Sequence, residues 1–373
     1  MPVFFFAGGA AGCYSYRRTA SAAGWLRSRI WRLAWPVLPL LALWIPLPTV
    51  LTSLGVPRQP VALAAGIVGQ LLWFLAVYLI MTALLPVMMA AHDRWGFGVP
   101  VALGAAAVGV DLLRFHSFQP IGYFNEVFVW LAVQQLGIAY ADGRLGRKAG
   151  PALAVGGFTV TALLVAAGGY PDSMVGLPGQ AVSNMSPATI CLLTLGCGQI
   201  GVLLVARERL VAWSKRRGPA RTVDVLGRRC MTIYLWHMSA LVVVAGIAVF
   251  AFGYATPPPG SLAWLVAFPC WIGLLAVVLT GLVAVFGRVE GRRQPVGTVS
   301  VPRLGIAFGL LVVGLTGIAA QGFSAPAGLT HPGPWPWTVL IVLGLALTVP
   351  DWRPRLAERG TRVLASLVAG LPK

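Results

Sequence analysis

Long apolar runs alternate with short connections along the whole 373-residue chain, and this alternation leaves few folds open. A helix that crosses a membrane needs about 20 mostly apolar residues, so a series of such runs indicates repeated crossing of a bilayer. Hydrophobic residues make up 58% of the chain and charged residues only 10%, against about 25% charged residues in a typical soluble domain. The sequence therefore predicts an all-α fold, a polytopic transmembrane bundle of about 10 to 11 helices.

Hydropathy also sets the expected domain organisation. The apolar segments lie at about 2–16, 33–54, 68–91, 98–113, 123–141, 151–169, 187–206, 230–252, 262–286, 304–322 and 335–350. From their spacing we expect a membrane domain over 1–290, two additional transmembrane helices over 291–350 and a basic tail over 351–373. Several of these runs contain proline, which kinks or breaks a helix unless neighbouring groups bind the freed carbonyls.

Positive charge is distributed unevenly between the two sides of the predicted bundle. Of the 28 Lys and Arg residues, all but Arg58 and Arg114 fall in every second connection or in the tail. By the positive-inside rule, the C-terminus should lie in the cytoplasm, with the bundle in contact with membrane lipid. Arginine greatly outnumbers lysine, and Ala and Gly are frequent, which is typical of a GC-rich bacterial genome, so we expect a bacterial cytoplasmic (inner) membrane. The net charge of +18 does not indicate nucleic acid as a partner, because the basic residues are interleaved between apolar runs.

The usual motifs of metal and covalent chemistry are missing from the sequence. The five cysteines lie in or beside apolar runs, and the spacings CxxC and HExxH do not occur. Cys191 and Cys197 are about 240° apart around one helix, so they cannot bind one ion together. We therefore predict no metal. The absence of GxxxxGK[ST] and GxSxG argues against an ATP-driven pump and an acyl-serine mechanism.

His237 is the most unusual polar residue of the predicted membrane core. In the stretch LGRRCMTIYLWHM, a basic cluster runs into an apolar helix, which places His237 about 10 Å deep if the membrane begins near Cys230. An ionisable side chain at that depth usually faces the bundle interior or a wet cavity and is a candidate for function. The alternative is a neutral histidine that is hydrogen-bonded to a neighbouring helix.

A second group of polar residues lies at the opposite, outer end of the bundle. Asp111 and Arg114 are three residues apart and are expected to pair on one helix face. Glu126 follows Asn125 at the start of the next segment, and His116 lies in the loop between. Glu126 is therefore the freer carboxylate of this group.

The outer loop from Gly169 to Pro187 is rich in turn-forming residues and includes Ser173 and Asn184. Its apolar residues argue against a freely solvated coil, so we expect the loop to fold back onto the bundle. The alternative is a compact connector without any role in ligand binding.

Several stretches together resemble the bacterial acyltransferase 3 family of integral membrane O-acyltransferases. The resemblance is carried by VFFFAGG at Val3–Gly9, the arginines that follow it, LWFLAVYL at Leu72–Leu79, FVWLAVQQLG at Phe128–Gly137, SMVGLPG and SNMSP in the outer loop, and MTIYLWHM at Met231–Met238. It covers about residues 3–290. It implies transfer of an acyl group from cytosolic acyl-CoA to a hydroxyl on an extracytoplasmic sugar, cell-envelope glycan or lipid.

This resemblance assigns expected roles to residues of the chain. Guanidinium groups bind phosphates in a bidentate manner, so basic residues at the cytosolic ends of helices should form the mouth for acyl-CoA. The expected donor-binding residues are Arg17, Arg18, Arg29, Arg32, Arg228 and Tyr234. The expected catalytic residues are His237 and Glu126. The expected acceptor-binding residues are Asn125, His116, Ser173 and Asn184.

The resemblance begins at what looks like the second helix of the family. Family members are expected to start with a helix that carries an arginine and, near its end, a histidine that acts as the base on the acceptor hydroxyl. We therefore expect that the chain as given lacks this first helix, which leaves its activity uncertain. Two alternatives stay open: a transporter or permease of an envelope precursor, and a catalytically inactive acyltransferase homologue.

Overall fold

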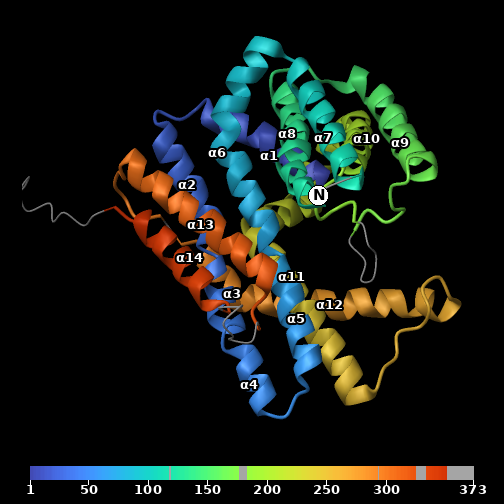
Figure 1. Cartoon of the computed structure of the whole chain (residues 1–373), viewed down its shortest axis with the longest axis vertical. Coiled ribbons are helices and arrows are strands. Elements are labelled where there is room, and N and C mark those ends of the chain that lie inside the picture. The colour runs from blue at the N-terminus through green and yellow to red at the C-terminus, as the bar shows by residue number, and fades with distance from the viewer. Residues whose placement is uncertain (117–118, 176–182, 293, 325–332, 351–373) are drawn as a thin grey trace, which may run out of the picture.

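Every regular element in the described part of the chain is helical (Figure 1). The computed structural model describes residues 1–116, 119–175, 183–292, 294–324 and 333–350. The α-helices are α1 (Pro2–Tyr16), α2 (Ala22–Ala34), α3 (Val37–Trp44), α4 (Leu47–Ser53), α5 (Arg58–Gln70), α6 (Leu72–Trp95), α7 (Gly98–His116), α8 (Asn125–Ala141), α9 (Gly150–Ala167), α10 (Ile190–Ser214), α11 (Arg217–Phe252), α12 (Leu262–Glu290), α13 (Val301–Gln321) and α14 (Trp335–Leu347). Two short 3₁₀ helices cover Gln119–Phe124 and Arg147–Ala149.

The predicted class, an all-α transmembrane bundle, is confirmed. Within the described ranges, eight helical stretches are long and apolar enough to cross a membrane. Three of them combine neighbouring helices: Ala22–Ser53 (α2 to α4), Arg58–Trp95 (α5 and α6) and Arg147–Ala167 (the second 3₁₀ helix and α9). The shorter α1, α8 and α14 occupy the other predicted segments. The predicted tail over 351–373 lies outside the described residues.

Three helical stretches begin well before the apolar run that predicted them, and one of these, expected from residue 68, begins at Arg58. The helix expected from residue 33 begins at Ala22, where the Ser21 hydroxyl accepts a hydrogen bond from the Gly24 amide at 3.2 Å. The helix expected from residue 230 begins at Arg217. With 36 residues, α11 is about 54 Å long, which exceeds the roughly 30 Å hydrocarbon core. Hydropathy locates only the part of a helix that lies in lipid, because the backbone bonds continue through its basic end.

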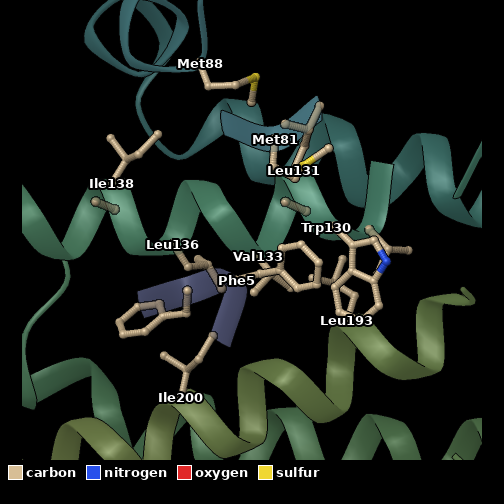
Figure 2. Packing of buried hydrophobic residues seen from close by; sticks show 14 of the residues in the cluster. Phe5, Met81, Met88, Trp130, Leu131, Val133, Leu136, Ile138, Leu193 and Ile200 are labelled. Carbon is tan, nitrogen blue, oxygen red and sulfur yellow. The ribbon is translucent and has the colours of Figure 1, made fainter. Parts of the chain in front are cut away.

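Two hydrophobic clusters hold the bundle together. In the first, Phe5 of α1 packs among Trp130, Leu136 and Ile200 from α8 and α10, as Figure 2 shows. The second cluster joins α2, α3, α5 and α6 to α11, α13 and α14. Since α6 contributes to both clusters, it links the two halves of the molecule.

Glycine allows α1 and α8 to pack backbone against backbone. A Cβ atom built at Gly137 of α8 would overlap the Phe6 carbonyl oxygen of α1, and one built at Gly9 would overlap the Gln134 carbonyl oxygen. Small residues at such crossings are typical of transmembrane helix pairs, where close approach maximises dispersion contacts. This contact fixes the position of α1 against α8.

Arg27 attaches the C-terminal helices to the first part of the chain. Its side chain is 6% exposed. Its guanidinium donates to the carbonyl oxygens of Thr348 (2.7 Å), Gly297 (2.6 Å) and Pro295 (2.7 Å). Carbonyls at a helix C-terminus carry partial negative charge, so the Thr348 carbonyl just after α14 suits a cation. Together with the second cluster, this places α13 and α14 within the bundle.

The charge distribution predicts the orientation of this bundle in the membrane. A reporter enzyme that works only in the cytoplasm should be active when it is fused at Gly218, at the basic start of α11. A reporter enzyme that works only outside the cytoplasm should be active when it is fused at Gly169, after α9. Activity of both fusions on one side would contradict the topology.

Candidate functional site

A cavity of about 270 Å³ lies between α1, α2, α6, α8 and α11, and we call it the inner cavity. Its lining residues are Phe4, Phe5, Ala7, Gly8, Ala11, Gly12, Trp25, Arg29, Arg32, Leu33, Tyr78, Met81, Thr82, Leu85, Gln134, Cys230 and Met231. Most of these residues are apolar, and the two arginines come from α2. The cavity therefore has an apolar length and a cationic end.

Small residues of α1 let it pack closely against α6 along this cavity. A Cβ atom at Gly8 would lie 2.7 Å from the Tyr78 hydroxyl oxygen, and one at Gly12 would lie 2.9 Å from a Leu85 methyl group. The lining extends from Phe4 to Gly12, which corresponds to about 12 Å along a helix. The cavity can therefore receive an extended, slender group that lies along α1.

Arg29 is held at the cationic end by neighbours of α1 and α2. Its Nη2 donates to the Ser15 hydroxyl at 2.6 Å, and its guanidinium lies 5.6 Å from the centre of the Trp25 ring. The Trp25 indole also donates to Ser15, at 3.0 Å. Arg32, one turn further along α2, is exposed and lines the same cavity. Two guanidinium groups one turn apart suit phosphate oxygens.

Gln134 supplies an unused hydrogen-bond acceptor to the inner cavity. Its Nε2 donates to the Met81 carbonyl at 3.0 Å, whereas its buried Oε1 has no partner among the described residues. An unpaired buried acceptor is costly, so a ligand N–H at this point would be stabilising.

Glu126 is connected to the far end of the inner cavity through two aromatic rings. Phe5 stacks on Trp130 with ring centres 4.5 Å apart, and the Trp130 indole donates to Glu126 Oε2 at 2.8 Å. The Ala188 amide donates to Glu126 Oε1 at 3.0 Å. These two bonds orient the carboxylate, and each oxygen retains capacity for another bond.

Asp111 does not form the expected ion pair with Arg114. Its carboxylate accepts hydrogen bonds from Asn125 Nδ2 (2.8 Å), the Tyr170 hydroxyl (3.0 Å) and the Ile190 amide (2.9 Å). Arg114 donates to the Pro187 carbonyl instead, at 3.3 Å. The pKa of the Tyr170 phenol is raised by burial and by the neighbouring carboxylate, so the hydroxyl stays protonated and continues to donate. The sequence prediction of this pair was wrong because it considered one helix alone.

The comparison with protein families decides what this architecture belongs to. The family model for the acyltransferase 3 domain matches residues 1–287, which is more than half of the chain. The chain belongs to the acyltransferase 3 family. The comparisons with curated proteins and with solved structures returned no match. The family confirms the resemblance seen in the sequence and identifies the chain as a membrane protein of acyltransferase type.

Not all of the predicted donor-binding residues of the acyltransferase lie together. Arg29 and Arg32 line the inner cavity, and Arg228 lines an adjoining pocket that also includes Arg32. The other two residues line neither cavity: Arg17 pairs with Asp142, and Arg18 is exposed elsewhere on the surface.

Tyr234 packs beside the inner cavity without lining it. Its hydroxyl donates to the Leu71 carbonyl at 2.6 Å, and its ring centre lies 5.0 Å from that of Phe74. His237 lies one turn further along α11, with its Nδ1 2.5 Å from the Tyr234 carbonyl oxygen, and does not line the inner cavity either. Among the expected catalytic residues, Glu126 thus has the more direct connection to the cavity.

The predicted acceptor-binding residues do not form one site: Asn184 contacts Ser173, whereas Asn125 contacts Asp111. Asn125 is buried against Asp111, and His116 is exposed at the end of α7. Asn184 donates to the carbonyls of Pro171 (2.7 Å) and Ser173 (3.0 Å), which ties the two ends of the outer loop together. The residues 176–182 of this loop lie outside the described part of the chain.

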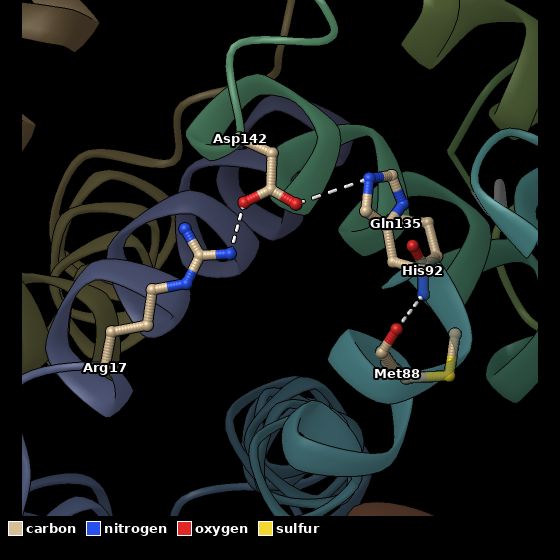
Figure 3. A network of polar contacts seen from close by, with 5 residues as sticks. All are labelled: Arg17, Met88, His92, Gln135 and Asp142. Atoms are coloured by element: carbon tan, nitrogen blue, oxygen red, sulfur yellow. Dashed lines mark hydrogen bonds and ion pairs between the residues drawn. The ribbon is translucent and has the colours of Figure 1, made fainter. Parts of the chain in front are cut away.

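Sequence reasoning missed Gln134 and a polar network at the basic side of the acyltransferase, shown in Figure 3. There, Asp142 pairs with Arg17 and lies 3.5 Å from His92, whose side chain is completely buried. Gln135 donates to the Met88 carbonyl at 2.7 Å. The available signal was two consecutive glutamines inside an apolar run, since such amides seek partners in neighbouring helices.

Proposed function

We propose that this acyltransferase moves an acyl group from acyl-CoA, bound from the basic side of the membrane, to a hydroxyl of an extracytoplasmic sugar, cell-envelope glycan or lipid. The observation that carries this proposal is the inner cavity. It has phosphate-binding groups at one end and an oriented carboxylate beyond the other, with a slender apolar space between. A carrier with phosphates at its head and a long acylated arm fits this order of groups.

The proposed reaction is a transfer from a thioester to an alcohol. The acceptor oxygen attacks the acyl carbon, a carbon–oxygen bond forms, and the carbon–sulfur bond breaks to release CoA. Glu126 takes the proton of the attacking hydroxyl and then gives it to the departing sulfur, which restores the carboxylate and releases CoA as the thiol. Within the cavity, Gln134 Oε1 accepts a hydrogen bond from an amide N–H of the carrier arm, which fixes the depth of the thioester.

The expected orientation follows from the same assignment. The donor end lies at the cytoplasmic face of the inner membrane, on the same side as the C-terminus, and the acceptor end lies outside. This arrangement matches the excess of positive charge at the donor end with an anionic donor.

The test of the proposal is donor binding by a double lysine variant. Replacement of both Arg29 and Arg32 by Lys should weaken binding of acetyl-CoA to the purified protein about tenfold, because an ammonium group offers a point charge in place of a planar fork. Calorimetry in detergent measures the dissociation constant. Arg209→Lys, at an exposed position on α10, is the matched control and should bind as the wild type does.

Turnover of radiolabelled acyl-CoA with a panel of envelope glycans and lipids separates the alternatives. Binding with turnover supports the transferase. Binding without turnover on any acceptor would indicate an inactive homologue, and absence of binding would favour a transporter of an envelope precursor. Unchanged affinity of the double lysine variant would remove these arginines from the donor site.

A further inference from the structure

A second cavity of about 310 Å³ adjoins the inner cavity, and we call it the arginine pocket. It lies between α2, the basic part of α11 and the segment that follows α12. Its lining residues are Ser28, Trp31, Arg32, Trp35, Pro36, Arg228, Glu290, Arg292 and Gln294. Arg32 lines both cavities, so one elongated ligand can occupy the two.

Three buried N–H groups of the lining residues have no acceptor in the described part of the chain. They are Trp31 Nε1, Trp35 Nε1 and Gln294 Nε2. The Trp31 side chain is only 6% exposed, so water cannot readily satisfy it. A buried donor without a partner costs free energy, and three around one cavity indicate that a ligand rich in acceptor atoms supplies the partners.

The charges around the arginine pocket favour an anion. Arg32, Arg228 and Arg292 contribute three guanidinium groups. Arg292 lies 5.3 Å from the centre of the Trp35 ring, which fixes it at the wall of the pocket. Arg228 forms an exposed pair with Asp224 at 2.5 Å, and such surface pairs are weak enough to yield to a ligand.

Glu290, the acidic residue of the lining, directs its carboxylate to another group. It accepts hydrogen bonds from the amides of Met231 (3.0 Å) and Thr232 (2.9 Å) and from the Thr232 hydroxyl (2.6 Å). These three donors of α11 therefore hold the carboxylate of Glu290. The groups left for a ligand are donors and cations.

We propose that the arginine pocket binds a phosphate group. Its source is either the nucleotide end of the acyl-CoA donor, in which case the assignment rests on the proposed function, or the headgroup of an anionic lipid. Arg292 and Gln294 lie beyond residue 287, where the family match ends. The segment that follows the matched region thus completes a ligand site of the enzyme.

The experiment compares Arg292→Gln with Arg221→Gln, an exposed arginine of α11 that lines neither cavity. Binding of the full chain to three probes is measured. The probes are acetyl-CoA, S-acetylpantetheine, which has no phosphate, and nanodiscs with or without phosphatidylglycerol. We expect Arg292→Gln to weaken acetyl-CoA binding about tenfold and to leave S-acetylpantetheine binding unchanged. Arg221→Gln should change neither.

The arms distinguish the two sources and the two proposals. A loss confined to phosphatidylglycerol would support the phosphate site and assign it to lipid. No loss with acetyl-CoA or phosphatidylglycerol would overturn the site. If the wild type binds neither acetyl-CoA nor S-acetylpantetheine, the donor assignment fails, and the phosphatidylglycerol arm alone decides for or against the pocket. Trp31→Phe, which removes an unpaired N–H and keeps an aromatic ring, should reproduce part of the loss.

Discussion

Replacement of Glu126 by Gln should lower the turnover number of acyl transfer about 10²- to 10⁴-fold, the usual contribution of a general base. The carboxylate is oriented by the Trp130 indole and the Ala188 amide, and Trp130 stacks on Phe5 at the far end of the inner cavity. Gln has nearly the same shape and cannot accept the hydroxyl proton. Donor binding should be retained, because Arg29 and Arg32 lie at the opposite end of the cavity.

The measurement is single-turnover transfer with acetyl-CoA in reconstituted vesicles, alongside His237→Gln and His116→Gln. His237 does not line the inner cavity, and His116 is exposed at the end of α7. Both variants should transfer the acyl group much faster than Glu126→Gln does. A large loss in His237→Gln with near-normal Glu126→Gln would move the base to α11. Thermal melting of each variant checks that the fold is intact.

Replacement of Gly137 by Val should destabilise the bundle more than any substitution on a lipid-facing surface. The added side chain would overlap the Phe6 carbonyl oxygen and approach the Ala10 amide. These are backbone atoms, which cannot rotate away, so α1 must separate from α8. Overpacking costs about 1–3 kcal/mol where side chains adjust, and we expect a cost at or above the top of that range here.

The melting temperature in detergent measures this effect, and Gly156→Val is the matched control. Gly156 is a helical glycine of α9 with no atom within 4 Å of an added Cβ. It should melt close to the wild type. Equal melting temperatures for the two variants would show that α1 and α8 do not pack as closely as the structure indicates.

The positions of the apolar helices were predictable because burial in lipid requires a nearly uninterrupted apolar run. The predicted segments 2–16 and 262–286 coincide with α1 and with most of α12. Pro86 lies inside α6 without ending it, which shows that proline alone did not decide the boundaries. Family membership was likewise contained in the order of the motifs.

The site was only partly predictable. Arg29, Arg32 and Arg228 were recognised as cytosolic arginines, and the structure brings them to two adjoining cavities. Arg27 belongs to the same cluster in the sequence, yet it binds three backbone carbonyls and serves the attachment of the C-terminal segment. Nothing in the local sequence separates these arginines, because neighbouring residues of one helix face different partners.

Sequence by itself determined the class of fold, the approximate place of each helix and the family. These depend on composition and local order, since the cost of exposing polar groups to hydrocarbon acts on each segment separately. Tertiary structure alone decided that Asp111 binds Asn125 and Tyr170 in place of Arg114, that Gln134 keeps a free acceptor beside the inner cavity, and that three unpaired N–H groups surround the arginine pocket. Such pairings depend on which helices pack side by side and at what rotation, and residues far apart in the chain settle both.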